Sequence, residues 1–144
     1  MKSRRLRIVA VVIAVLLVGI QLIPVAHSNP PATKEPQWDS PETRALFMRA
    51  CGDCHSNESK WPAYSYVAPA SWFVANHVKD GRFELNVSEF NVPANRLPRL
   101  LRNTEQSITR ADMPLPSYLW IHPEAKLSEA DKTTLINGIK ASFK

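Results

Sequence analysis

The two cysteines of this 144-residue chain constrain its fold more than any other feature, because they lie three residues apart and a histidine follows at once. The segment reads Cys51-Gly52-Asp53-Cys54-His55. Two intervening residues place both thiols on one face of a turn, where they can add to the two vinyl groups along one haem edge, and the next imidazole then lies under the iron. The spacing therefore predicts one covalent c-type haem held by Cys51 and Cys54, with His55 as the proximal iron ligand.

Three other chemistries use the same cysteine spacing and remain alternatives. A thioredoxin-like redox dithiol needs a βαβ context, which the sequence does not show. Half of a zinc site would recruit His55 with His77 or His122, but structural zinc sites usually pair two such knuckles and the chain has only one. A plain disulfide closing so short a loop would constrain the unfolded chain little. Haem attachment is therefore the favoured interpretation.

The sixth iron ligand is specified less sharply than the attachment site. Met113 is the favoured candidate, since it lies downstream of the cysteines and before the last predicted helix, and Pro114 prevents a helix from continuing through it. The alternative is that Met113 only fills a gap in the core. His77 and His122 are the other candidate ligands.

Many aromatic residues follow the attachment motif, and they are expected either to wall a haem and exclude water or to form an ordinary core. They are Trp61, Tyr64, Tyr66, Trp72, Phe73, Tyr118 and Trp120.

An apolar run from Ile8 to Ile23 follows four cationic residues near the amino terminus. Positive residues stay on the cytoplasmic side, so residues 1–7 are predicted to be cytoplasmic and everything after the run to be translocated. The segment 8–25 is then a transmembrane anchor or a signal segment.

Cleavage of this segment is the less favoured of two interpretations. The one small-x-small site is Ala26-His27-Ser28, before Asn29, and Pro24 directly follows the apolar core. An uncleaved anchor gives a single-pass protein of a bacterial inner membrane with its domain in the periplasm. Cleavage after Ser28 gives a soluble periplasmic protein.

The net charge argues against nucleic acid as a partner. The formal charge is +5, and subtracting the four cations at residues 2, 4, 5 and 7 leaves +1 for the rest of the chain. A balance so close to zero gives no overall excess of positive charge with which to hold phosphates.

The remaining chain divides into a tether and one domain. Residues 26–37 are polar and proline-rich, which predicts an extended tether, and residues 38–144 form the predicted haem-binding domain. A first helix should begin after Ser40, which can cap it, with Pro41 in its first turn, and should run to about Gly52.

The later elements are also predicted to be helical, and no stretch shows the sustained alternation typical of strands. We expect a helix at 71–79 ended by Asp80-Gly81, short helical turns at 88–90 and 97–101, a helix at 104–111, an extended loop at 113–116 and a C-terminal amphipathic helix capped by Ser128 with Asp131 in its first turn. The fold class is therefore all-α, a small helical domain around one covalent haem.

Several segments resemble one known family, the small bacterial membrane-anchored haem-binding-domain proteins of the cytochrome c-like superfamily. The likeness is carried by Cys51-Gly52-Asp53-Cys54-His55-Ser56-Asn57, by residues 38–43, 61–69 and 122–128, and by the pairs Ser71-Trp72, His77-Val78, Gly81-Arg82, Leu85-Asn86 and Met113-Pro114.

The resemblance implies one membrane-tethered haem c on the outer face of the inner membrane. It implies Cys51 and Cys54 as attachment points and His55 as the proximal ligand, and the family pattern has a methionine-proline pair at the position of Met113. Members are mostly uncharacterised, so no physiological partner comes with the resemblance.

The favoured functional hypothesis is a non-enzymatic one-electron carrier with His55 and Met113 in both axial positions, exchanging electrons with a redox partner protein. The alternatives are a haem-based peroxidase or gas sensor with an open sixth position, and a non-haem dithiol oxidoreductase.

Overall fold

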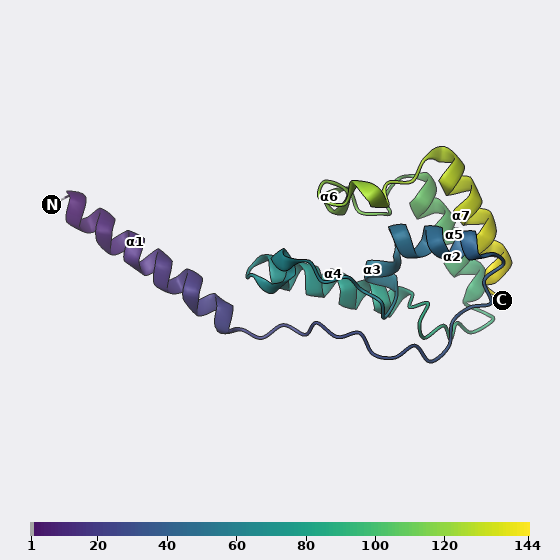
Figure 1. The fold of residues 1–144 in the computed structure, drawn as a ribbon, viewed down its shortest axis with the longest axis horizontal. Coiled ribbons are helices and arrows are strands. Elements are labelled where there is room, and N and C mark those ends of the chain that lie inside the picture. Colours follow the sequence, from purple (N-terminus) through teal and green to yellow (C-terminus); the bar gives the residue numbers. More distant parts are fainter. Residues whose placement is uncertain (1) are drawn as a thin grey trace.

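The computed structural model describes residues 2–144, and helices make up most of them (Figure 1). These residues form no β-strand, and one isolated parallel bridge joins Lys34 to Glu89. The all-α prediction is therefore confirmed. The elements are α1 (Lys2–Gly19), η1 (Ile20–Leu22), α2 (Pro41–Ala50), α3 (Gly52–His55), η2 (Ala63–Tyr66), α4 (Ala70–Glu84), α5 (Leu97–Thr109), α6 (Pro116–Leu119), η3 (Pro123–Ala125) and α7 (Glu129–Ser142).

Helix α1 projects away from the rest of the molecule and buries none of its residues (Figure 1). Within Lys2–Leu22, the most apolar window of 18 residues has a mean hydropathy of 2.2, so by length and composition the helix can cross a membrane, although a signal sequence would have the same character. The helix begins among the basic residues, because lysine and arginine are good helix formers.

Helices α2 and α7 pack against each other and carry much of the core. The Ser40 hydroxyl accepts a hydrogen bond from the Thr43 amide at 3.1 Å, which caps α2 as expected. Ser128 and Asp131 form a complete capping box at the start of α7. Gly138 on α7 lies so close to Thr43 on α2 that a Cβ there would overlap the threonine side chain. The two caps were predicted, and the close crossing was not.

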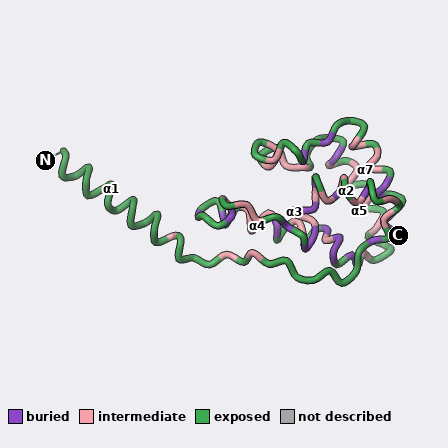
Figure 2. The backbone as a smooth tube through the Cα atoms, viewed as in Figure 1, coloured by how far each residue is buried: buried purple, intermediate pink, exposed green. Residues whose placement is uncertain are grey.

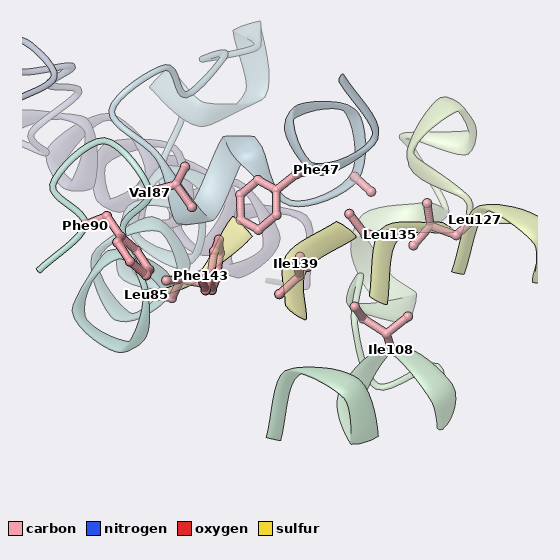
Figure 3. Close-up of a cluster of buried hydrophobic side chains, with 10 residues drawn as sticks. Phe47, Leu85, Val87, Phe90, Ile108, Leu127, Leu135, Ile139 and Phe143 are labelled. Atoms are coloured by element: carbon pink, nitrogen blue, oxygen red, sulfur yellow. The ribbon is translucent and has the colours of Figure 1, made fainter. Parts of the chain in front are cut away.

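Many of the buried residues gather where α7 packs against α2 and α5 (Figure 2). The last helix is amphipathic as predicted, since Leu135, Ile139 and its C-cap residue Phe143 are buried and Ile136 is half-buried. Figure 3 shows Leu135, Ile139 and Phe143 beside buried side chains of the other elements. The core cluster consists of Phe47, Ala50, Leu85, Val87, Phe90, Ile108, Leu127, Leu135, Ile139 and Phe143.

Helix α4 corrects the prediction that Asp80-Gly81 ends the helix begun near Ser71. The helix continues to Glu84. A Cβ at Gly81 would lie 2.5 Å from the backbone oxygen of Cys54, so the glycine allows α4 to approach α3 closely. The sequence pattern of a helix stop here reflects a packing requirement between two helices.

Helix α5 replaces two predicted elements, the turn at 97–101 and the helix at 104–111. The polar pair Arg102-Asn103, which separates the two predicted elements in the sequence, does not interrupt the helix, because both residues lie on its exposed face. Ile108 and the leucines near the start of the helix face the core. Ala111, with a φ of 58°, follows the helix in the left-handed region.

Two shorter predictions are also wrong in detail. Residues 88–90 do not form a helical turn: a turn at 87–88 leads into Glu89, which forms the bridge with Lys34, and the Phe90 amide donates to the Lys34 carbonyl at 2.7 Å. Pro116 does not extend the loop before it but opens the short helix α6, because proline fits the first turn of a helix.

The segment 26–37 is extended, as predicted, but it lies along the domain. The amides of Thr33 and Lys34 both donate to the Ser88 carbonyl, at 2.9 and 3.2 Å. The Arg82 guanidinium donates to the Ser28 carbonyl and to the Asn29 side chain, at 2.9 Å each. This segment is therefore part of the folded unit.

Substitution of Gly81 tests the packing of α4 on α3. We expect Gly81→Ala to lower the free energy of unfolding by about 1–3 kcal/mol, because the added methyl group meets backbone that cannot move aside. Alanine is otherwise the better helix former, so helix propensity alone predicts the opposite sign. Urea denaturation of the full chain in detergent, followed by circular dichroism, measures the change.

The matched control is Gly19→Ala, since a Cβ at Gly19 meets nothing within 4 Å. Equal unfolding free energies for the two variants would contradict the close approach of α4 to α3.

Candidate functional site

The cysteine-histidine motif forms a single tight turn between α2 and α4. Cys51 ends α2, and the amides of Cys54 and His55 both donate to its carbonyl, at 3.1 and 2.9 Å. Both cysteines are half-buried and carry free thiols. The turn therefore brings two thiols and an imidazole together on one short element.

The imidazole of His55 is held by a backbone carbonyl. Its Nδ1 lies 3.0 Å from the carbonyl oxygen of Leu85, just after α4. A carbonyl only accepts hydrogen bonds, so Nδ1 carries the proton and Nε2 keeps its lone pair for a metal. Burial lowers the pKa of His55, which favours the neutral imidazole that coordination requires. The Val87 amide donates to the His55 carbonyl at 2.9 Å and holds the backbone in place.

Both thiols are protonated at neutral pH. Burial, together with the neighbouring Cys54, raises the pKa of Cys51 to about 12. Burial and the Asp53 carboxylate raise the pKa of Cys54 to about 11. Reactive redox dithiols instead carry at least one thiol whose pKa is lowered, so this environment does not suit a dithiol oxidoreductase.

Helix α4 places His77 on the side that faces the turn at residues 51–55, which we call the attachment turn after its proposed role. Gly81 contacts Cys54, and His77 lies four residues earlier, so both share one face of the helix. The His77 ring packs edge-on against Phe73, with ring centroids 4.2 Å apart. It makes no hydrogen bond to any other residue in 2–144.

Met113 lies in the loop between α5 and α6, with 37% of its surface exposed. Its amide donates to the Ser107 carbonyl at 3.1 Å, which fixes the loop to the end of α5. Five residues later, the Tyr118 hydroxyl donates to the Asp53 carboxylate at 2.6 Å. Because Asp53 lies between the two cysteines, this bond ties the loop of Met113 to the attachment turn.

His122 is occupied by other partners. Its Nε2 lies 2.7 Å from the Tyr64 hydroxyl, and its Nδ1 lies 3.0 Å from the Glu124 carboxylate. Its ring also stacks on Tyr118 at 4.2 Å. To coordinate a metal, His122 would have to break one of these hydrogen bonds.

Sequence reasoning missed the connecting residues Asp53, Tyr64 and Tyr118. Burial and the bond to Asp53 raise the pKa of the Tyr118 phenol, so it stays protonated and donates. The available signal was the spacing of Tyr118 and His122, four residues apart, which places two rings on one side of a turn. Nothing in the sequence indicated that this pair meets the residue between the cysteines.

Four of the seven aromatic residues expected to wall a haem fall into two groups. Phe73 and Trp120 are 58% and 83% exposed, an unusual exposure for large apolar rings. Trp61 and Trp72 instead line a cavity of about 730 Å³ beside residues 23–28. Neither this cavity nor a second one of about 510 Å³ is lined by the cysteines or by His55.

The donor set fits a covalently attached haem better than it fits a metal ion alone. Free Cys51 and Cys54 thiols on one turn can form two thioethers, and the Nε2 of His55 is free to coordinate iron. Across residues 2–144, no three His, Cys, Asp or Glu side chains gather as a bare metal ion requires.

The chain was also compared with known proteins. Residues 15–141 match the family model described as a haem-binding domain, which covers most of the chain. Searches of curated proteins and of solved structures each returned no match. The turn that carries Cys51, Cys54 and His55 lies inside the matched range, and the chain belongs to the haem-binding domain family.

Proposed function

We propose that this chain attaches one haem c through Cys51 and Cys54, coordinates its iron through His55, and carries single electrons. The observation that carries the proposal is the turn itself, where two free thiols stand on either side of Gly52-Asp53 and the His55 ring, with its Nδ1 bonded to the Leu85 carbonyl, keeps Nε2 unprotonated. The family match supports haem as the cofactor. When bound, haem supplies an iron that alternates between the ferrous and ferric states.

The residues around the turn would hold the cofactor in a defined position. The Leu85 carbonyl orients the His55 ring and makes Nε2 a stronger donor. Gly81 lets α4 press against Cys54, so the attachment turn has little room to move. Rigid ligands suit electron transfer, because little rearrangement then accompanies the change of iron charge.

We propose Met113 as the sixth ligand. Its loop is tied to Asp53 through Tyr118, and its thioether has no competing polar partner. His77 is the alternative, since it shares the face of α4 that contacts the turn. His122 is disfavoured, because both of its ring nitrogens already have partners.

We also propose that α1 remains as an anchor in the inner membrane and holds the domain at the periplasmic face. The length and apolar character of α1 support a membrane span, and the cations at its start favour a cytoplasmic amino terminus. Electron donors and acceptors would then be redox proteins at the same membrane surface.

The attachment is tested by Cys54→Ser, with protein matured in a host that assembles c-type cytochromes. One thioether and one free vinyl group should remain, so the reduced pyridine-haemochrome band should move to longer wavelength than in the unsubstituted protein. An unshifted band would mean that Cys54 does not form a thioether.

The sixth ligand is tested by comparing Met113→Ala with His77→Ala. If Met113 coordinates the iron, only its removal should abolish the methionine–iron charge-transfer band and raise the ferric spin state, with haem still attached. Absorption and electron paramagnetic resonance spectra measure both effects. Loss of the low-spin signal in His77→Ala alone would assign the ligand to His77, and a high-spin ferric iron in the unsubstituted protein would show an open sixth position.

The tie between the loop and the turn is tested by Tyr118→Phe. Loss of the hydroxyl leaves Asp53 without its tyrosine partner and should lower the free energy of unfolding by about 1–3 kcal/mol, because a hydrogen bond to a charged group is lost. The methionine–iron band should also weaken as the loop loosens. Tyr66→Phe is the control, since the Tyr66 hydroxyl has no hydrogen-bond partner in residues 2–144. Equal effects in both variants would contradict the proposed tie.

A further inference from the structure

The end of the apolar helix is fastened to one loop of the domain. The Gln21 side chain bonds both to the Ala68 amide, at 2.9 Å, and to the Ala68 carbonyl, at 3.2 Å. Six residues later, His27 bonds to the Ser65 carbonyl at 2.7 Å and stacks on Tyr66 at 4.2 Å. If α1 spans a membrane, these bonds hold the loop around Ala68 at the level of the lipid headgroups.

A cavity of about 730 Å³ lies at this junction, between residues 23–28 and helix α4. One part of its wall is apolar and includes Ile23, Val25 and Val78. The indoles of Trp61 and Trp72 also line it. The cavity is therefore amphipathic and sits beside the point where the chain would enter the bilayer.

The two indole side chains that line this cavity each carry a hydrogen-bond donor with no partner in the described chain. The Nε1 groups of Trp61 and Trp72 are both buried, and neither finds an acceptor among residues 2–144. A buried donor is costly to leave unpaired. A ligand with carbonyl oxygens beside an apolar chain would satisfy both groups, and tryptophan has this role at membrane interfaces.

The charge of the cavity wall favours an anion. No acidic residue lines it, and its two cations are Lys79 and Arg82. The Arg82 guanidinium is already used, since it bonds to the carbonyl of Ser56 and to the Ser59 hydroxyl, besides its bonds to the segment before α2. The Lys79 ammonium is exposed and forms no ion pair within the described chain, so it is free to meet a phosphate.

We propose that this cavity binds the head and ester region of an anionic phospholipid. The indole N–H groups of Trp61 and Trp72 donate to the lipid ester carbonyls, and Lys79 pairs with the phosphate. The acyl chains continue along α1 into the bilayer. The proposal rests on α1 being retained as an anchor, and it adds a lipid site on the side of α4 that the haem site does not use.

The test is native mass spectrometry of the full chain, released from micelles that contain equal amounts of phosphatidylglycerol and phosphatidylcholine. We expect one retained lipid per chain, with phosphatidylglycerol preferred. The double variant Trp61→Phe with Trp72→Phe leaves an aromatic ring at each position but removes both donors, and it should reduce the retained lipid about tenfold. Lys79→Gln should abolish the preference for phosphatidylglycerol and keep some phosphatidylcholine bound.

Two control variants separate this site from general effects of substitution. Trp120→Phe changes an indole that is 83% exposed and lies outside the cavity wall, so lipid retention should not change. Lys126→Gln removes an exposed cation that does not line the cavity. Equal losses in the cavity variants and their controls, no retained lipid, or a quinone retained in place of phospholipid would overturn the proposal.

The same spectra keep this proposal apart from the proposed anchoring. A chain that begins at Asn29 would show that α1 is removed, and both proposals would then fail. An intact chain that carries no lipid would overturn only the lipid site and leave the anchor and the haem site standing.

Discussion

The bond between His55 Nδ1 and the Leu85 carbonyl, at 3.0 Å, is the interaction on which the proposed chemistry depends. It decides which ring nitrogen carries the proton, and so which nitrogen can face iron. It forms only because α4 reaches past Gly81 and delivers Leu85 beside the attachment turn. Gly81 allows that approach, since any side chain there would meet the backbone of Cys54. A packing contact between two helices therefore sets the orientation of the proposed ligand.

The far side of the site depends on a second set of contacts. Tyr118 joins the loop after α5 to Asp53, and the same ring stacks on His122, which bonds to Tyr64. This network connects the loop that carries Met113 to the turn at residues 51–55, although the two are distant in sequence. Both ring nitrogens of His122 have hydrogen-bond partners in this network, which is why we propose Met113 ahead of His122 as the sixth ligand.

The sequence predicted local features well and tertiary ones poorly. The tight turn at residues 51–55 and the capping box at Ser128 follow from spacing within a few residues, and the structure contains both. The sequence around Gly81 predicts a helix stop, because the real constraint on this residue, the backbone of Cys54, lies far away in the chain. For the same reason, the sequence does not indicate the pairing of Asp53 with Tyr118. The composition of residues 26–37 predicts a tether, since it says nothing of the surface on which the segment lies.

The central claim is covalent haem attachment at Cys51 and Cys54, and the intact mass of the purified protein tests it most directly. Protein matured in a host that assembles c-type cytochromes should be treated with acid-acetone, which removes non-covalent haem. The account predicts that the chain remains coloured and is heavier by the mass of one haem. A colourless chain with the mass of its amino acids alone would contradict it.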